Sequence, residues 1–432
     1  MQQPIQVTPN GRFLQRADGT PFFYLGDTAW QLFHRLNLAD ATHYLTNRAA
    51  KGFTVIQAVA LAELGGLDVP NANGDLPLLA RDPTRPNEAY FRHVDAVVAE
   101  ANRLGLVMGL LPTWGSYWKS TGFNAAPIFT PESARVYGRF LGERYRESDL
   151  IWILGGDRNA TDEGERAIIR AMAQGLSEGD GGVHLKTYHP IGPGRSAEVF
   201  PDADWLDFHM CQTSHGSHDH DNGLLIEADY LLDPPKPTLD GEPRYETIPV
   251  GFYFQNHNRY DRFDAYDVRQ AAYWAMLAGS CGHTYGNNNV WQMWTPEHKP
   301  VIFADVPWQE AIDHPGAFQM GLLRRIFERY DYQQLQPAPA LVVDGPRFGG
   351  AKIRAALAQD GSFAFVYSPQ GAPFAVARSQ LKAAQVTEIW FDPRYGSTHQ
   401  IHVGDGGTFQ TYTPPTSGRG NDWLLILDGR GV

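Results

Sequence analysis

Short apolar segments alternate with amphipathic helical patterns along residues 1–335, and this alternation constrains the fold more than any other feature of the sequence. Strands buried on both faces appear as continuous apolar runs, whereas helices repeat apolar residues three and four positions apart. Eight candidate strands occupy residues 22–25, 54–59, 106–111, 150–154, 185–188, 207–210, 237–240 and 280–284. Helical patterns separate them at 38–50, 91–104, 131–145, 163–176 and 268–277. This order predicts an α/β fold, a (β/α)8 TIM barrel. A doubly wound sheet is the alternative, but no glycine-rich nucleotide motif follows the first strand.

The pattern changes after a last helical segment at residues 318–330 and the sequence Gln-Pro-Ala-Pro at 336–339. Short alternating runs follow at 352–357, 362–367, 387–391 and 423–427, separated by glycine and Asp-Gly turns. Such spacing is typical of antiparallel sheets. We therefore expect a catalytic barrel in residues 1–335 and a small antiparallel β-sandwich in residues 336–432. Phe363, Phe365 and Tyr367 are expected to point into the sandwich core.

The charge balance excludes two classes of partner. A net charge of −12 without a Lys/Arg cluster argues against nucleic acid and against an anionic membrane surface. No apolar run reaches the ~20 residues that span a bilayer. The first residues, Met-Gln-Gln-Pro-Ile, lack the regions of a signal peptide, so the compartment is cytoplasmic, or secreted or periplasmic with a leader already removed. Two cysteines, Cys211 and Cys281, form no disulfide framework and no cysteine-based metal site.

Polar and aromatic residues follow the predicted strands at many points. In a barrel, the residues after the strands meet at one face, where active sites lie. Aromatic residues make up 12% of the chain, and their flat faces suit sugar rings. The side chains expected to contact a ligand are Asp27, Trp30, Gln57, Trp114, Arg158, His189, Gln212, His215, His218, Glu246, Tyr285, Asn287 and Trp291.

Two carboxylates at these strand ends suit the hydrolysis of a glycosidic bond. Asp157 follows the fourth strand and Glu242 the seventh. Glycoside cleavage needs one protonated carboxyl for the leaving oxygen and one ionised carboxyl on the other side of the sugar. Strands four and seven face each other across a barrel, which suits the ~5–5.5 Å separation of a retaining enzyme. Three rival carboxylates and a purely structural role for Asp157 in its glycine-rich turn remain open; the rivals are Glu63, Asp240 and Glu246.

Several longer motifs resemble the apiosidase-like glycoside hydrolases. The matching segments are FYLGDTAW (23–30), WILGGDRN (152–159), DGEPRYE (240–246), GHTYGN (282–287) and WQM (291–293). They cover the barrel nearly from end to end. In the tail, WFDPR (390–394) and GNDW (420–423) resemble the small β-domain that usually follows this barrel and is sometimes labelled collagen-binding.

The resemblance implies that Asp157 is the acid/base and Glu242 the nucleophile of a retaining enzyme. An Asp at the acid/base position departs from the Asn-Glu pair of the wider clan but agrees with this family. The implied reaction is the release of β-linked apiose from plant pectin side chains or plant glycosides, with a carbohydrate partner and no cofactor.

Other functions remain as alternatives. One is another retaining β-glycosidase or endoglycanase of the same clan. Another is a non-catalytic polysaccharide-binding protein, although loss of Asp157 and Glu242 would mark such a protein and both are present. The histidines at 215, 218 and 220 suggest zinc, but ligands on one loop rarely close a site and no His-Glu-x-x-His helix supports it, so we expect no metal. The tail is expected to pack on the barrel rather than to bind a ligand.

Overall fold

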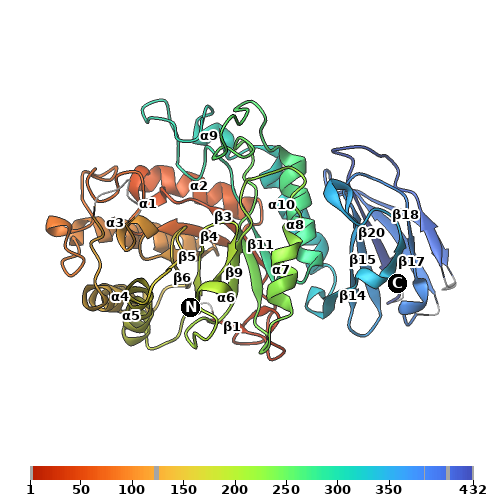
Figure 1. The fold of residues 1–432 in the computed structure, drawn as a ribbon, viewed down its shortest axis with the longest axis horizontal. Helices are drawn as coiled ribbons and strands as arrows, with labels where there is room; N and C mark the ends of the chain where they lie inside the picture. The colour runs from red at the N-terminus through yellow and green to blue at the C-terminus, as the bar shows by residue number, and fades with distance from the viewer. Residues whose placement is uncertain (1–2, 121–125, 384, 405–408, 431–432) are drawn as a thin grey trace.

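The computed structural model of the chain describes residues 3–120, 126–383, 385–404 and 409–430. Eight parallel strands form a curled sheet in the order β7-β6-β5-β4-β3-β11-β10-β9, and the short antiparallel β8 (Gly194–Arg195) lies beside β9 (Figure 1). The two ends of the parallel array meet, because Thr187 Oγ1 donates to Phe208 O at 2.7 Å. The parallel strands are β3 (Tyr24–Thr28), β4 (Val55–Val59), β5 (Val107–Leu111), β6 (Leu150–Leu154), β7 (Lys186–Tyr188), β9 (His209–Gln212), β10 (Thr238–Glu242) and β11 (Gly282–Tyr285). The predicted barrel is confirmed.

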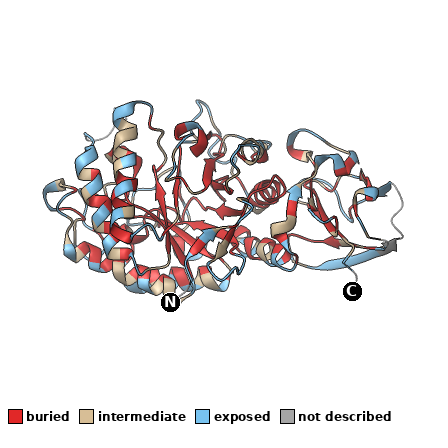
Figure 2. Ribbon diagram, turned by 90° about the horizontal axis from the view of Figure 1, so that it is seen from below, coloured by how far each residue is buried: buried red, intermediate tan, exposed pale blue. Residues whose placement is uncertain are grey.

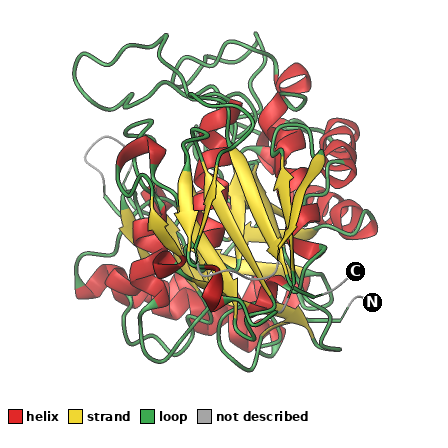
Figure 3. Ribbon diagram, turned by 90° about the vertical axis from the view of Figure 1, so that its right-hand side faces the viewer, coloured by secondary structure: helices red, strands yellow, loops and turns green. Residues whose placement is uncertain are grey.

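Helices surround these strands, as Figure 3 shows. Local sequence sets where several of them begin: the side chains of Asn37, Thr130, Asp162 and Asp264 each accept a backbone N–H of the first turn. The longer helices are α2 (Leu38–Ala50), α3 (Glu88–Arg103), α4 (Pro131–Tyr145), α5 (Glu163–Asp180), α7 (Gly223–Tyr230), α8 (Ala265–Leu277) and α10 (Pro315–Glu328). Single turns form α1 (Leu32–Arg35), α6 (Ser196–Val199) and α9 (Trp308–Ala311).

The first barrel strand lies further along the chain than predicted. It spans Tyr24–Thr28 rather than 22–25, so Asp27 lies inside the strand instead of after it. The reason is an ion pair: the buried Asp27 carboxylate accepts from Arg48 Nε at 2.5 Å, and Tyr44 also donates to it. The ion pair gives one oxygen of this buried carboxylate its partners, at a strand position that sequence pattern alone assigns to a loop.

The tail forms two antiparallel sheets, which confirms the predicted sandwich. The larger sheet has the order β12-β14-β15-β20-β17-β18 and the smaller β13-β16-β19. The strands of the larger sheet are β12 (Leu335–Pro337), β14 (Arg354–Ala358), β15 (Phe363–Ser368), β17 (Val386–Phe391), β18 (Thr398–Gly404) and β20 (Trp423–Asp428). Those of the smaller sheet are β13 (Val342–Asp344), β16 (Phe374–Val376) and β19 (Gln410–Tyr412). The predicted boundary at 335/336 falls within β12, and the division of the chain into two domains at this point stays a prediction.

Strand β15 is buried on both faces, and the predicted orientation of its aromatic residues is wrong. Phe363, Phe365 and Tyr367 pack with the barrel, while Ala364 and Val366 face the sandwich core. Figure 2 shows the buried strands of both parts, and Figure 1 shows α8 and α10 between these parts. The large side chains of β15 fill the space against these helices, so the bulkier face of the strand belongs to the junction rather than to the domain's own core.

A buried ion pair joins the two parts. Arg269 of α8 donates to both carboxylate oxygens of Asp422, from Nη2 at 2.7 Å and from Nε at 3.1 Å. Tyr367 Oη donates to the same carboxylate at 3.0 Å, and the Tyr367 ring stacks on Tyr273 with centroids 4.8 Å apart. Because neither charge reaches water, each depends on the other.

We expect Asp422→Ala to lower the free energy of unfolding by about 3–5 kcal/mol, because Arg269 would remain buried without a counter-charge. Equilibrium unfolding in urea measures the change. Glu328→Ala, which removes one side of the half-exposed Arg324–Glu328 pair on α10, should alter stability by about 0.5 kcal/mol or less. Equal effects of the two variants would contradict the structural role of the Arg269–Asp422 pair.

Candidate active site

A pocket of about 300 Å³ lies at the carboxyl ends of the barrel strands. Asp157 and Glu242 both line it, from the turn after β6 and from the last residue of β10. The remaining lining residues are Trp30, Glu63, Trp114, Ile191, Gly192, Gln212, Ser214, His215, Tyr245, Ile248, Phe252, Tyr253, Trp291 and Ile302. The structure therefore brings together the two predicted catalytic carboxylates and five of the predicted ligand contacts, namely Trp30, Trp114, Gln212, His215 and Trp291.

An irregularity in β10 directs the Glu242 side chain into the pocket. The pairing with β9 shifts between Asp240 and Glu242, so that Gly241 is passed over. Asp240 accepts hydrogen bonds from Thr213 Oγ1 at 2.7 Å and from Asn222 Nδ2 at 3.1 Å, away from the pocket. In a regular strand, residues two apart share a face. The bulge breaks this rule, so that the Asp240 carboxylate points away from the pocket and the Glu242 carboxylate lines it.

Asp157 lies at the end of three consecutive residues with left-handed backbone, Gly155, Gly156 and Asp157 itself, with φ of 96°, 78° and 59°. A Cβ atom on Gly155 would lie 2.4 Å from His189 O, so the first position requires glycine. A hydrogen bond from the segment after β5 holds the turn: Trp118 Nε1 donates to Gly155 O at 2.7 Å. A non-glycine residue at positive φ stores strain, a common property of functional positions.

Two histidines contact Glu242. His215 Nε2 lies 3.2 Å from Oε1, and His189 Nε2 lies 3.3 Å from Oε2. The Asp157 N–H donates to His189 Nδ1 at 3.2 Å. Because Nδ1 acts as an acceptor, the proton of a neutral His189 ring lies on Nε2, which faces the carboxylate. One imidazole thus links the backbone of one carboxylic residue to the side chain of the other.

The surroundings move the pKa values of the two carboxyls apart. Burial raises the pKa of Asp157, and the nearby Glu242 charge raises it further, against the opposing effects of Arg158 and His189. Burial alone would also raise the pKa of Glu242, but its contacts with His189 and His215 outweigh burial and hold that pKa well below its usual range. Arg158 Nη1 forms an ion pair with Asp157 Oδ2 at 2.6 Å. Below about pH 6 this arrangement favours a protonated Asp157 beside an ionised Glu242.

Aromatic side chains form the walls of the pocket. Trp30 packs against Trp114, with centroids 5.6 Å apart, and meets His189 edge to face at 5.5 Å. On another side, the His215 ring contacts Tyr245 at 4.7 Å and Phe252 at 5.9 Å. These walls limit the access of water and offer flat apolar faces to a ring.

Other residues predicted to bind ligand lie behind the pocket rather than in its lining. The Asp27 carboxylate forms its ion pair with Arg48. Gln57 Nε2 donates to Thr284 Oγ1 at 3.0 Å and to Gly241 O at 3.2 Å, inside the barrel. His189 and Arg158 touch the two carboxylates without lining the pocket.

Glu246, Tyr285 and Asn287 belong to one network. Tyr285 Oη donates to Glu246 Oε2 at 2.5 Å, Gly316 N donates to its Oε1 at 3.2 Å, and Asn287 Nδ2 lies 2.9 Å from His314 Nδ1. Burial raises the pKa of Glu246 to about 7. The three predicted ligand contacts thus hold β11 and the start of α10 together, and none of them lines the pocket.

The histidines of the 215–220 loop point to different partners. His218 lies 2.9 Å from Asp267 Oδ1 and 2.9 Å from Asp261 Oδ1, and these bonds, the one to Asp267 first, raise its pKa to about 9. His215 instead faces Glu242. Among the residues that the structure describes, no group of three His, Cys, Asp or Glu side chains is arranged to hold a metal ion.

Sequence reasoning missed several lining residues. Tyr245, Ile248, Phe252 and Tyr253 come from the long segment between β10 and α8, and Ile302 from the segment before α9. Irregular loops carry no periodicity from which their position could be inferred. Reading only the first residues after each strand can identify Tyr245, which lies soon after the end of β10, but not the lining residues further along the same segment.

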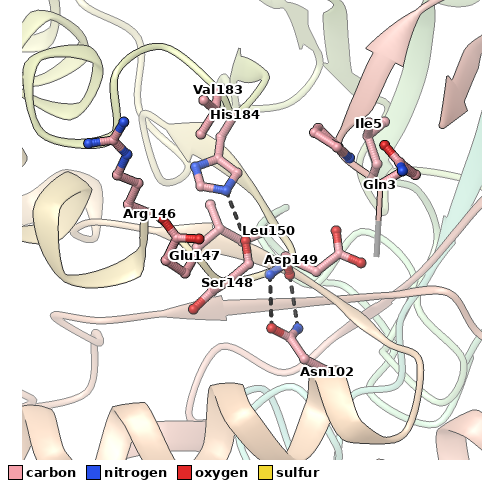
Figure 4. A pocket seen from close by; sticks show the side chains of 11 residues that line it. Gln3, Ile5, Asn102, Arg146, Glu147, Ser148, Asp149, Leu150, Val183 and His184 are labelled. Carbon is pink, nitrogen blue, oxygen red and sulfur yellow. Dashed lines mark hydrogen bonds between the residues drawn. The ribbon is translucent and has the colours of Figure 1, made fainter. Parts of the chain in front are cut away.

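A larger cavity of about 830 Å³ lies at the opposite end of the barrel, where β6 begins (Figure 4). Two of its polar side chains are engaged within the chain: His184 bonds Ser148 O at 2.9 Å and Asp180 Oδ2 at 3.0 Å, and Asn102 bonds the backbone of Asp149. Barrel enzymes keep their chemistry at the other face. Size alone therefore does not identify the active site.

Comparisons with known proteins agree with this geometry. A solved structure described as a glycoside hydrolase is 30% identical, has a TM-score of 0.89, and covers 99% of this chain and 97% of its own. A family 5 glycoside hydrolase from Bacteroides vulgatus is 28% identical, also at 0.89, covering 98% and 93%. A family 5 mannosidase from Rhizomucor miehei, 14% identical with a TM-score of 0.53 over 76% of this chain and 99% of its own, shares the fold alone. A search of curated proteins found no match.

The fold and these relatives place the chain among the barrel glycoside hydrolases. Residues 8–334 match the model of the apiosidase-like catalytic domain, and the chain belongs to that family. Residues 336–428 match a domain described as "putative collagen-binding domain of a collagenase". None of the helices in the described part of the chain has the length and apolar character that crossing a membrane requires.

We expect Gly155→Ala to lower the rate of glycoside hydrolysis by about 100-fold, because the new Cβ would press on His189 O and displace Asp157 by a fraction of an ångström or more. Rates on an aryl glycoside, measured together with thermal unfolding, test this. Gly182→Ala is the matched control, since Gly182 also has positive φ (75°) but nothing within 4 Å of its Cβ position. That variant should lose about 1 kcal/mol of stability and keep its activity. Full activity of Gly155→Ala would contradict the requirement for glycine.

Proposed function

We propose that this protein is a retaining β-glycosidase that releases a terminal uncharged sugar, with β-apiosides as the favoured substrates. The observation that carries the proposal is the pairing of two carboxyls with opposite pKa shifts in one pocket, Asp157 upward and Glu242 downward. Retaining glycosidases need one protonated and one ionised carboxyl at the same time.

The residues divide the reaction between them. Glu242, kept ionised by His189 and His215, attacks the anomeric carbon while Asp157 gives its proton to the departing oxygen. The C–O bond to the aglycone breaks and a glycosyl–Glu242 ester forms. Asp157, now ionised beside Arg158, takes a proton from water, which attacks the ester and restores Glu242. Configuration is retained because two inversions occur in succession.

The pocket favours a small neutral sugar. Its volume of about 300 Å³ is at the lower end of the ~300–1,000 Å³ typical of small-molecule sites, which suits one terminal unit better than a long chain. Glu63, Asp157 and Glu242 line it, and no lysine or arginine does so in the described part of the chain. A uronic acid would meet negative charge without a partner. Family membership then favours apiose among neutral sugars.

A panel of 4-nitrophenyl glycosides tests the substrate directly. It should contain the β-apioside, neutral hexosides and pentosides, and a glucuronide. We expect the highest kcat/KM on the β-apioside and none above background on the glucuronide. A preference for another neutral sugar would keep the reaction class and change the substrate, whereas binding without turnover of any member would favour a non-catalytic polysaccharide-binding protein.

Azide separates the roles of the two carboxyls. Asp157→Ala should lose most activity on natural glycosides, about 100-fold or more, and retain more on an activated aryl glycoside that needs little proton transfer. Azide should rescue it and give a glycosyl azide of retained configuration. Glu242→Ala should fail on every substrate without azide and give the inverted azide with it, because the two groups lie on opposite sides of the anomeric carbon. NMR of the products measures configuration; the reverse pattern would exchange the roles.

The pKa shifts predict a bell-shaped pH dependence for kcat/KM on a natural glycoside. Activity falls on the acid side as Glu242 gains a proton, at a pH below that of an ordinary carboxyl. It falls on the alkaline side as Asp157 loses its proton, at a pH above that of an ordinary carboxyl. With a dinitrophenyl glycoside, the alkaline limb due to Asp157 should weaken, because the first step no longer needs the acid. An unchanged alkaline limb would argue against Asp157 as the acid.

A further inference from the structure

A third carboxyl, Glu63, lines the same pocket and has no part in the double displacement. It lies in the segment after β4 and is half-buried. The other two carboxyls are engaged, Asp157 with Arg158 and Glu242 with His189 and His215. The Glu63 carboxyl, in contrast, makes no hydrogen bond or ion pair with any described residue, so its oxygens are available to whatever enters the pocket.

The backbone around Glu63 is held in place. Gln31 Nε2, on a fully buried side chain, donates to Glu63 O at 3.1 Å. Tyr117 Oη donates to Ala62 O at 2.7 Å, on the preceding residue. Leu64 and Gly65 then turn the chain through positive φ values of 58° and 91°. An anchored backbone before a tight turn gives the side chain a fixed origin at the pocket wall, as expected for a residue that positions a ligand.

The electrostatic setting keeps a proton on this group. Burial raises the pKa of Glu63 to about 8, and the charges of Asp157 and Glu242 raise it in the same direction, against the weaker opposing effects of Arg158 and Arg35. At neutral pH the side chain therefore has one O–H donor and one free acceptor oxygen. Such a group can donate to one sugar oxygen and accept from a neighbouring hydroxyl.

We propose that Glu63 is a substrate-positioning residue, which holds an uncharged sugar in the pocket by hydrogen bonds between its carboxyl group and the sugar hydroxyls. The inference rests on the proposed glycosidase function, whose reacting centre it would orient. The contact would also be a source of selectivity, because a sugar that lacks the matching hydroxyl leaves this carboxyl unsatisfied.

Two variants of Glu63 test the contact on an activated aryl glycoside. Glu63→Gln keeps the shape and a donor, so kcat/KM should stay within about 5-fold of the wild type. Glu63→Ala removes the contact and should lower kcat/KM by about 10–100-fold, with the larger part in KM if binding is lost equally in ground and transition states. Asp68→Asn is the control, since this exposed carboxylate lies in the same segment and pairs with Arg81 at the surface. It should change neither constant. Glu63→Ala with unchanged kinetics would overturn the proposal.

The pH profile separates Glu63 from a merely structural side chain and from the catalytic acid. In Asp157→Ala, on a dinitrophenyl glycoside, the titration of Asp157 is absent. We expect kcat/KM to fall as pH rises through the Glu63 pKa, which removal of the Asp157 charge shifts somewhat below about 8. The double variant Asp157→Ala/Glu63→Gln should lack this limb, because the amide does not ionise. A limb that persists in the double variant would overturn the inference.

The same experiments distinguish failure of this inference from failure of the proposed function. If Glu63→Gln were as inactive as Glu63→Ala on natural glycosides and both were restored by an activated leaving group, Glu63 would be the catalytic acid, contradicting both assignments. If azide rescue of Asp157→Ala failed while the Glu63 limb remained, the mechanism would be wrong and the contact by Glu63 would stand. Direct titration of the enzyme with free apiose at pH 6 and at pH 9 adds a readout without turnover: binding should weaken at pH 9 in the wild type but not in Glu63→Gln.

Discussion

The hydrogen bond from the Asp157 backbone N–H to His189 Nδ1 is the contact on which the site depends. It assigns the remaining ring proton to Nε2, and that atom lies 3.3 Å from Glu242. One ring thereby joins the segment after β6, which holds Asp157, and the segment after β7, which holds His189, to Glu242 at the end of β10. The glycine turn before Asp157 brings that N–H within reach of the ring. The turn needs glycine at position 155, because a side chain there would collide with the His189 carbonyl.

Charge separation follows from this arrangement. In a desolvated pocket, ionising one carboxyl disfavours ionisation of its neighbours, so the local contacts determine which carboxyl carries the charge. Contacts with two histidines lower the pKa of Glu242. Burial and repulsion between the carboxylates raise the pKa values of Asp157 and Glu63. Below about pH 6, where Asp157 and Glu63 both hold a proton, Glu242 is the one anion of the three, which suits a site in which a nucleophile, a proton donor and a sugar-binding group work together.

Much of this could be predicted from the sequence. Continuous apolar runs and amphipathic helices indicated the barrel, and the bounds of α2 and α4 match the predicted ones because their periodicity is strong and their first residues are capped. The strand-end rule brought Asp157 and Glu242 to one pocket. It failed to anticipate the position of Asp27, since only the fold reveals its pairing with Arg48. Alternation along the tail likewise failed to predict the orientation of Phe363, because the surface that Phe363 packs against belongs to another part of the chain. From the sequence, Glu63 was one acidic residue among several, because its lack of a partner among the described residues is a property of the three-dimensional structure.

The central claim is that histidine contacts and burial give Asp157 and Glu242 opposite protonation states, and a direct titration tests it most closely. Carbon-13 NMR of the enzyme with labelled Asp and Glu carboxyls, assigned with Asp157→Asn and Glu242→Gln, follows each group through pH. We expect the Glu242 signal to titrate well below the range of an ordinary glutamate and the Asp157 signal well above that of an ordinary aspartate. Titration of Asp157 before Glu242 would contradict it.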